Sequence, residues 1–339
     1  MSFNRILGQE QPKQILKNAL QNSSVAHAYL FYGQESIGKK RTAIELAKAL
    51  NCTALVQGGA CDQCQTCRKI ENRIHPDFFY IEPVKSTPTA REAAIKIEAI
   101  RELQKKLAFL PYEGRNKVAV IDDADLMNPQ AANSFLKTLE EPPSSTILIL
   151  VSSNPFKLLP TLISRCQAIQ FHPLSTENVK KILKNILSEN EEALEDQDLD
   201  FRALRSRGCV QKAMTEDMAN MGNIREELVN LLEFISFDRM DIVFSHAKSW
   251  ARQPDQLETI LNELMELVRD SAFLRSGCSE SEIYNRDLAT RLKSVASKKS
   301  LKSWLEMFHT IHTTQIALSG NANAQLFLEN MLIDFCEAA

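Results

Sequence analysis

A glycine-rich loop between an apolar strand and a helix limits the folds that are open to this chain. Residues 33–39 read GQESIGK and place Gly33, Gly38 and Lys39 in the pattern Gly-x4-Gly-Lys, between the apolar run 28–32 and the amphipathic stretch 41–50. In this context the pattern predicts a phosphate-binding loop (P-loop), whose backbone N–H groups and helix N-terminus surround phosphates. The alternative is a tight strand-to-helix turn that binds no phosphate. Glycine makes up only 10 of the 339 residues, which favours the P-loop.

The residue after the lysine departs from the pattern of a P-loop that hydrolyses ATP. Such a loop carries Ser or Thr there, because the hydroxyl ligates magnesium. This chain has Lys40, whose ammonium cannot coordinate a cation and would repel it. Thr42 lies two residues further on, on a different side of the helix, and is a poor replacement. The loop can still hold an anion, but it is not built for metal-assisted phosphoryl transfer.

An apolar run at residues 118–121 ends in Asp122 and Asp123. P-loop ATPases present a magnesium-organising Asp and then a Glu that polarises the attacking water at the end of such a strand, and Asp123 is one methylene too short for the second role. The alternative is a pair of solvated acids. The sequence therefore predicts a degenerate nucleotide site made of Gly33, Gly38, Lys39, Asp122 and Asp123, in which we expect neither ATP nor Mg²⁺ to bind. Whether the site retains an anion stays open.

Four of the eight cysteines crowd into 16 residues, with the spacing Cys-x8-Cys-x2-Cys-x2-Cys. Four thiolates that converge from short steps, with no further donor, predict a closed, structural zinc site. An iron–sulfur cluster and unligated thiols are the alternatives. The predicted metal ligands are Cys52, Cys61, Cys64 and Cys67. The other cysteines are interpreted as small apolar residues: Cys166, Cys209, Cys278 and Cys336.

Short apolar runs alternate with helical patterns over the first 170 residues, which predicts an α/β domain with a parallel sheet and helices on both faces. The expected strands are 28–32, 78–82, 118–122, 147–152 and 168–171. The expected helices between them are 41–50, 95–108 and 129–139. From residue 175 onward the periodicity is helical, with long stretches at 224–237, 257–274, 301–319 and 324–336. We therefore expect three parts: an α/β domain at 1–173 with the cysteine insertion at 52–67, a small helical domain at 174–219, and an all-α domain at 220–339.

The charge balance excludes a generally basic, nucleic-acid-binding chain. Lys and Arg number 40 against 43 Asp and Glu, a net charge of −3, so any contact with nucleic acid has to come from a local patch. No apolar run approaches the roughly 18–20 residues that cross a bilayer, and the N-terminus lacks the order of a secretory signal. We expect a cytoplasmic protein.

Several segments, taken with these motifs, resemble the AAA+ clamp-loader family of the bacterial DNA polymerase III. They are residues 7–10 (LGQE), 27–31 (HAYLF), 133–143 (NSFLKTLEEPP) and 164–166 (SRC), with the four-cysteine insertion just after the P-loop helix. The match is dense from residue 5 to about 173 and compositional beyond. The resemblance implies an AAA+ domain, a helical lid at 174–219 and a collar at 220–339. It also implies as partners the motor and delta subunits of a five-subunit ring, with the sliding clamp and primed DNA reached through the complex, and no membrane.

The same resemblance implies a role for Arg165. In clamp loaders the arginine of the Ser-Arg-Cys element projects across a subunit boundary to phosphates bound by the neighbour, so Arg165 is the candidate arginine finger in trans. The alternative is a surface arginine in an ion pair. Residues 152–154 occupy the sensor region of the family. Gln211 stands where active subunits carry the arginine of the lid.

The resulting hypothesis is a non-motor subunit of the clamp loader. It belongs to the DNA polymerase III holoenzyme, a nucleotidyltransferase at the level of the assembly, and has no ATPase activity of its own. Two alternatives remain: an active AAA+ ATPase subunit of the clamp-loader type, and a free-standing zinc-containing adaptor that binds DNA.

Overall fold

The computed structural model describes residues 2–55, 59–85, 93–189, 195–215, 218–280, 282–319 and 323–337. The chain divides into two compact units, Met1–Met214 and Thr215–Ala339. The first holds the P-loop sequence, the cysteines of the insertion and Arg165, and the regular elements described in the second are all helices.

A five-stranded sheet forms the centre of the first unit. Its strands lie in the order β2-β5-β6-β1-β7, and every neighbouring pair is parallel. Their bounds are β1 Ala28–Tyr32, β2 Phe78–Ile81, β5 Lys117–Ile121, β6 Thr146–Ser152 and β7 Gln167–Gln170. This confirms the predicted fold class. β5 lies one residue earlier than expected, so Asp122 is the first residue after the strand and not its last.

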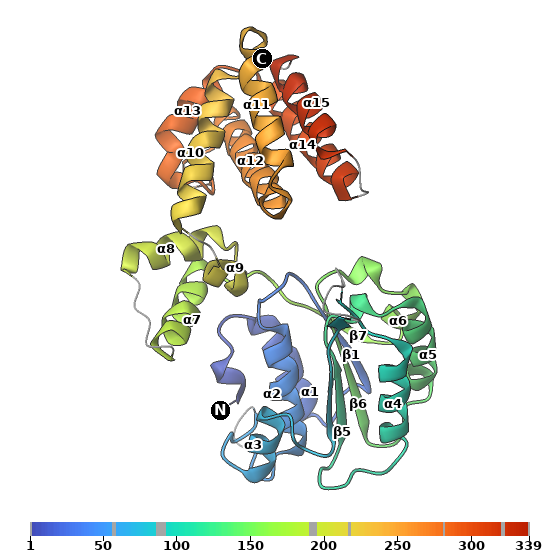
Figure 1. The fold of residues 1–339 in the computed structure, drawn as a ribbon. Helices are drawn as coiled ribbons and strands as arrows, with labels where there is room; N and C mark the ends of the chain where they lie inside the picture. Colours follow the sequence, from blue (N-terminus) through green and yellow to red (C-terminus); the bar gives the residue numbers. More distant parts are fainter. Residues whose placement is uncertain are drawn as a thin grey trace. The chain divides into compact units, whose positions relative to one another are not determined.

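Helices cover both faces of this sheet, which explains why its central strands are apolar without alternation. Figure 1 shows α1 (Glu10–Gln21), α2 (Lys39–Asn51) and α3 (Gln65–Glu71) on one side, and α4 (Ile97–Leu107), α5 (Pro129–Glu140) and α6 (Pro160–Ile163) on the other. Alternate residues of β1 point to opposite faces, because Tyr29 and Phe31 belong to one buried cluster while Ala28 and Leu30 belong to the other. The sequence analysis missed α1 and α3, as well as the short antiparallel pair β3 (Val84–Lys85) and β4 (Ala93–Ala94).

Three helices complete the first unit: α7 (Thr176–Glu189), α8 (Asp196–Arg205) and α9 (Val210–Thr215). The backbone N–H of Val210 donates to the carbonyl of Ser36 at 3.2 Å, so the start of α9 is fastened to the P-loop segment. These helices belong to the same compact unit as the α/β domain. A separate lid domain at 174–219 stays a prediction.

The second unit is a helical bundle. Its long helices are α10 (Met218–Phe234), α11 (Met240–Ala251), α12 (Pro254–Arg275), α13 (Ala289–Ser297), α14 (Leu301–Ser319) and α15 (Ala324–Glu337). Their apolar stripes meet in one core around Leu264, Trp304 and Phe335, each of which is fully buried. α11 and α13 were missed by the sequence analysis. Among the described helices, none has a stretch long and apolar enough to span a bilayer.

Candidate functional site

The P-loop segment connects the end of β1 to the start of α2, where the sequence analysis placed it. Gly33 has φ 141°, and a Cβ there would lie 2.3 Å from the carbonyl oxygen of Phe171, so no other residue fits. Gly38 has φ 101° and directly precedes α2. Lys39 is buried, and its ammonium donates to the carbonyls of Gly33, at 2.7 Å, and of Gln34. The lysine is therefore folded back on its own loop.

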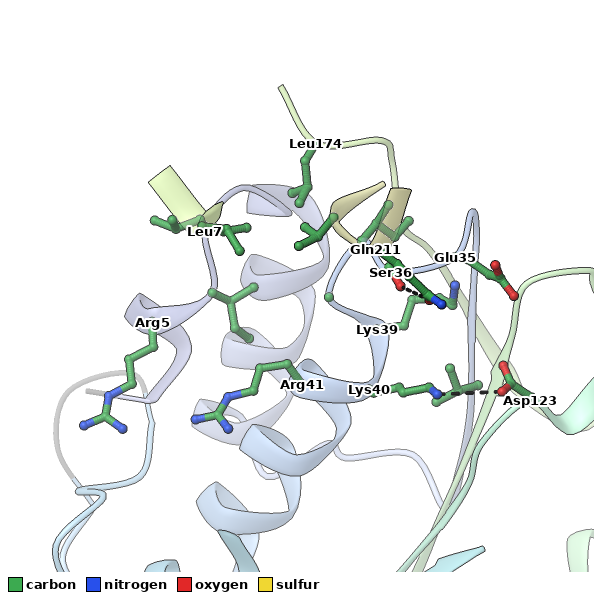
Figure 2. Close-up of a pocket in the computed structure, with 16 residues that line it drawn as sticks. Arg5, Leu7, Glu35, Ser36, Lys39, Lys40, Arg41, Asp123, Leu174 and Gln211 are labelled. Atoms are coloured by element: carbon green, nitrogen blue, oxygen red, sulfur yellow. Dashed lines mark hydrogen bonds and ion pairs between the residues drawn. The ribbon is translucent and has the colours of Figure 1, made fainter. Parts of the chain in front are cut away.

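Lys40 forms an ion pair with the acids at the end of β5. Its ammonium lies 2.6 Å from Asp122 Oδ2 and 3.7 Å from Asp123 Oδ2, and Figure 2 shows it extended toward Asp123. Burial alone would lower the pKa of Lys40, but the hydrogen bond and charge of Asp122 raise it above its usual value. A permanently charged ammonium thus lies against the carboxylate that the sequence analysis assigned to magnesium.

The two acids differ in their surroundings. Asp122 is 1% exposed and accepts hydrogen bonds from the Tyr80 hydroxyl, at 2.8 Å, and from the backbone N–H of Asp123, at 3.0 Å. Burial and the neighbouring Asp122 charge raise the pKa of Asp123. Thr42, the candidate replacement for the hydroxyl that the loop lacks, donates to the carbonyl of Gly38 at 2.8 Å and is fully buried. The Thr42 hydroxyl is therefore engaged with the backbone and does not contact the Lys40–Asp122 ion pair.

A cavity of about 630 Å³ lies beside the P-loop and is closed in part by α9. Gln211 of α9 lies against the loop, with 3.0 Å between the Ser36 hydroxyl and Gln211 Oε1 (Figure 2). Cationic, acidic and apolar side chains line the cavity. The cations are Arg5, Lys39, Lys40 and Arg41, the acids are Glu35 and Asp123, and the apolar residues include Ile6, Leu7, Leu174, Ile182 and Val210.

Arg165 lies far from this cavity, near the N-terminal end of the strands, whereas the P-loop follows their C-terminal end. The P-loop follows the end of β1 at Tyr32, whereas Arg165 precedes the start of β7, and the register pairs Tyr29 with Gln167 in parallel. Since a strand rises by about 3.3 Å per residue, Gln167 lies about 13 Å from the level of Gly33 along the strands, and Arg165 lies in the turn that precedes Gln167. An arginine side chain cannot cover that distance, so Arg165 cannot reach its own chain's P-loop.

The Arg165 guanidinium is partly exposed and has a carboxylate partner. Its Nη2 donates to Glu140 Oε1 at 2.6 Å, and its Nη1 donates to the carbonyl of Thr161 at 3.0 Å. The side chains of Arg165 and Glu140 are 35% and 50% exposed. The ion pair that the sequence analysis named as the alternative role of Arg165 is therefore present. The guanidinium in this pair also faces solvent.

The four cysteines of the insertion converge, and their Sγ atoms all lie within 4.8 Å of one another. Cys52 directly follows α2, and Cys64 directly precedes α3. The backbone N–H groups of Cys61, Cys64 and Cys67 each donate to the sulfur of the preceding cysteine in the set, at 3.3–3.4 Å. Although burial opposes it, such N–H···S bonds lower the pKa of Cys64 to about 6. Burial raises the pKa of Cys52 and Cys67, by contrast. Four sulfurs at this spacing, three of which accept a backbone N–H, fit a tetrahedral zinc ion with Zn–S distances of about 2.3 Å.

The remaining cysteines are not part of this cluster. Cys209 and Cys336 are buried, as expected of small apolar residues, and Cys166 and Cys278 are partly exposed. All four are free thiols.

A charge network around the buried Lys48 joins the cysteine cluster to the P-loop helix. Lys48 of α2 is 1% exposed, and its ammonium lies 2.7–2.8 Å from carboxylate oxygens of Glu45, Asp62 and Glu71. Asp62 stands between Cys61 and Cys64, and Glu71 ends α3. Arg41 of α2 pairs with Glu45 and Glu71 as well. One lysine thus ties together the three segments that carry the four cysteines.

We expect Lys48→Met to lower the free energy of unfolding of the full chain by about 3 kcal/mol, because it leaves buried carboxylates without their common counter-ion. Guanidinium denaturation in the presence of zinc measures the change. Lys106→Met is the control, since Lys106 pairs with Glu102 at 2.7 Å on an exposed surface of α4, and it should cause no measurable change. Equal effects of the two variants would contradict the role of Lys48.

Among the residues that shape these sites, sequence reasoning missed Tyr80, Ser36, Glu140 and Lys48. Tyr80 and Glu140 reach Asp122 and Arg165 across the fold, from 42 and 25 residues away, and no spacing rule signals such pairs. A weak signal existed for Glu140, because the helix dipole disfavours a carboxylate at the C-terminal end of a helix and a nearby cation offsets that cost.

Comparison with known proteins gives these sites a family. The family model "DNA polymerase III, delta subunit" matches residues 8–175, and the model "DNA polymerase III, delta subunit, C terminal" matches residues 220–337. DNA polymerase III subunit delta′ of Bacillus subtilis is 28% identical over 335 residues, which cover 95% of each chain. This chain belongs to the delta-prime family of clamp-loader subunits.

Other relatives are also subunits of DNA polymerase III, one of them a delta′ subunit and another a tau subunit. Subunit delta′ of Pseudomonas aeruginosa is 37% identical over 173 residues, which cover 50% of this chain and 51% of that protein. Subunit tau of Escherichia coli is 33% identical over 214 residues, which cover 63% of this chain and 32% of tau. The similarity to tau is therefore confined to about a third of that longer protein.

Proposed function

We propose that this chain is a non-motor subunit of the bacterial replicative clamp loader, which supplies Arg165 to the nucleotide site of a neighbouring ATPase subunit. The observation that carries the proposal is the separation of the two functional elements within one chain. Arg165 lies at the end of the strands opposite the P-loop and is partly exposed, so it can serve phosphates that another subunit binds. A guanidinium offers a planar set of donors to a transferring phosphoryl group.

The chain's own P-loop supports the non-motor part of the proposal. A magnesium ion that bridges nucleotide phosphates needs a free carboxylate and a hydroxyl. Here Asp122 is paired with Lys40 at 2.6 Å, and the Thr42 hydroxyl bonds to the backbone. Binding of Mg²⁺ and ATP would require that the Lys40 ammonium be displaced from a buried carboxylate, so we expect no intrinsic ATP hydrolysis.

The cysteine cluster serves a structural zinc ion in this proposal. Cys52, Cys61, Cys64 and Cys67 would hold it, and a site closed by four thiolates has no open position for a substrate. Through Lys48 the module is fastened to α2, so zinc would stabilise the segment behind the P-loop without taking part in chemistry.

The partners follow from the family. The chain would join motor subunits and a delta subunit in a five-subunit ring, and would meet the sliding clamp and primed DNA through that complex. The helical second unit, which the C-terminal family model matches, is the proposed collar that holds the ring together.

A reconstitution from the organism's own clamp-loader subunits tests the proposal. We expect one copy of this chain in each purified complex, and loss of clamp-stimulated ATP turnover when it is left out. A complex of full composition and full turnover that forms without this chain would contradict the proposal.

The second candidate function is an active ATPase subunit. The cavity of about 630 Å³ and the presence of Lys39 favour it. Magnesium-dependent ATP turnover by the isolated chain, abolished by Lys39→Ala, would establish this alternative. Absence of turnover in the isolated chain, with full turnover in the reconstituted complex, would exclude it.

A further inference from the structure

Glu140 is placed where it can compete with a phosphate for Arg165. The carboxylate ends α5, and its Oε1 accepts from Arg165 Nη2 at 2.6 Å. Negative charge at the C-terminal end of a helix faces the negative end of the helix dipole, which is unfavourable. A nearby cation offsets that cost, and Arg165 supplies one beside Lys137 of the last turn of α5.

The backbone around Arg165 is held firmly while its side chain stays accessible. Leu162 of α6 is 1% exposed and packs in the same buried cluster as Phe135 and Leu139 of α5. Arg165 itself follows α6, and its backbone N–H donates to the carbonyl of Leu162 at 3.2 Å. Packing thus fixes the position of the Arg165 backbone, and the exposed ion pair with Glu140 orients the guanidinium.

We propose that Glu140 is a counter-ion that restrains Arg165 and weakens its attraction for the neighbour's nucleotide. This inference rests on the proposed role of Arg165 in trans. If the ion pair breaks when Arg165 binds phosphate, the pair competes with the nucleotide. If the pair persists, the carboxylate repels the phosphates. Both cases weaken the interaction, so the sign of the effect does not depend on which of them applies.

The strength of the restraint follows from the exposure of the pair. An ion pair between half-exposed side chains is weak, and its removal corresponds to about a two- to five-fold change in an equilibrium. A triphosphate carries several negative charges and displaces a single carboxylate readily. Glu140 would therefore keep the guanidinium ordered and neutralised in the free subunit, and would release it when a nucleotide-bearing neighbour is present.

Glu141 provides a matched control. It follows Glu140 directly, is exposed, and has no contact with Arg165 in the part of the chain that the structure describes. Glu140→Gln and Glu141→Gln remove the same charge from adjacent positions, so a general electrostatic effect would appear in both variants, and loss of the restraint would appear in the first alone.

The experiment measures kcat and KM for ATP in the reconstituted complex, with Glu140→Gln, Glu141→Gln, Arg165→Ala and the double variant Glu140→Gln/Arg165→Ala. In Glu140→Gln we expect KM at the adjoining site to fall about two- to five-fold relative to Glu141→Gln at low salt, with kcat no lower than in the unaltered complex. The difference should shrink at 0.5 M salt and should be absent in the Arg165→Ala background.

Two sets of outcomes separate this inference from the proposed function. A higher KM or a lower kcat in Glu140→Gln, or equal behaviour of the two glutamine variants, would overturn the restraint while leaving the role of Arg165 intact. Unchanged turnover in Arg165→Ala would overturn the role of Arg165, and the restraint with it.

Discussion

Arg165→Ala is expected to lower ATP turnover at the motor site that adjoins this subunit by about 10³-fold, which is the lower end of the range for an arginine that stabilises a phosphoryl-transfer transition state. The guanidinium is always charged and donates from a rigid fork, so no neighbouring group replaces it. The other motor sites in the complex keep the arginines that their neighbours supply. The loss is therefore best measured in single-turnover experiments, as the absence of rapid phosphate release from one site.

The controls for this prediction use the exposure of Arg165. Its ion pair with Glu140 lies on the surface, so the variant should fold and assemble as the unaltered chain does. Arg165→Lys keeps the charge but loses the planar fork, and should restore little of the turnover. Lys157→Ala, on the exposed turn between β6 and α6, should leave turnover unchanged. Normal turnover in Arg165→Ala would remove the proposed role.

Cys64→Ser is expected to reduce the zinc content from about one ion per chain to near zero, because a structural site with three thiolates loses its closed tetrahedral shell. Metal binding in such sites is part of the folding free energy. The segment between α2 and α3 should therefore open, and its amide hydrogens should exchange faster. Elemental analysis and hydrogen-exchange mass spectrometry measure the two effects.

The loss should be local, and the structure offers a matched control. Cys278 is a partly exposed free thiol in the second unit, so Cys278→Ser should retain zinc and leave exchange in residues 59–71 unchanged. The bundle of the second unit should exchange normally in both variants. A Cys64→Ser chain with full zinc content would contradict the site, and iron in place of zinc in the unaltered chain would favour the iron–sulfur alternative.

Local patterns predicted most of the fold of the first unit. The five strands of the sheet were expected within one or two residues of their observed bounds, because a strand buried on both faces reads as an uninterrupted apolar run. Two of the missed helices, α3 and α13, were short. α3 is a seven-residue helix within the cysteine insertion, too short for a clear period. The bundle helix α13 has nine residues and four buried positions, which gives a weak stripe.

The chemistry of individual residues was also legible from the sequence. Lys40 after the P-loop lysine, the spacing of the four cysteines and the Ser-Arg-Cys element are local facts, and each carries its chemical meaning without coordinates. The ion pairs between these residues and distant partners could not be predicted from the sequence. Lys40 and Asp122 lie 82 positions apart, Arg165 and Glu140 lie 25 apart, and nothing in their spacing indicates that they touch.

The sequence by itself determined that this chain forms a parallel sheet between helices, that its P-loop lacks the hydroxyl for magnesium, and that its thiols come in a zinc-like set. The tertiary structure alone decided that Lys40 neutralises Asp122, that Lys48 ties the cysteine module to α2, and that Arg165 stands beyond reach of its own loop. The physical reason is that elements and donor types follow from short-range periodicity and residue chemistry, whereas ion pairs and sheet edges follow from strand order and register, which bring together residues that are distant in the chain.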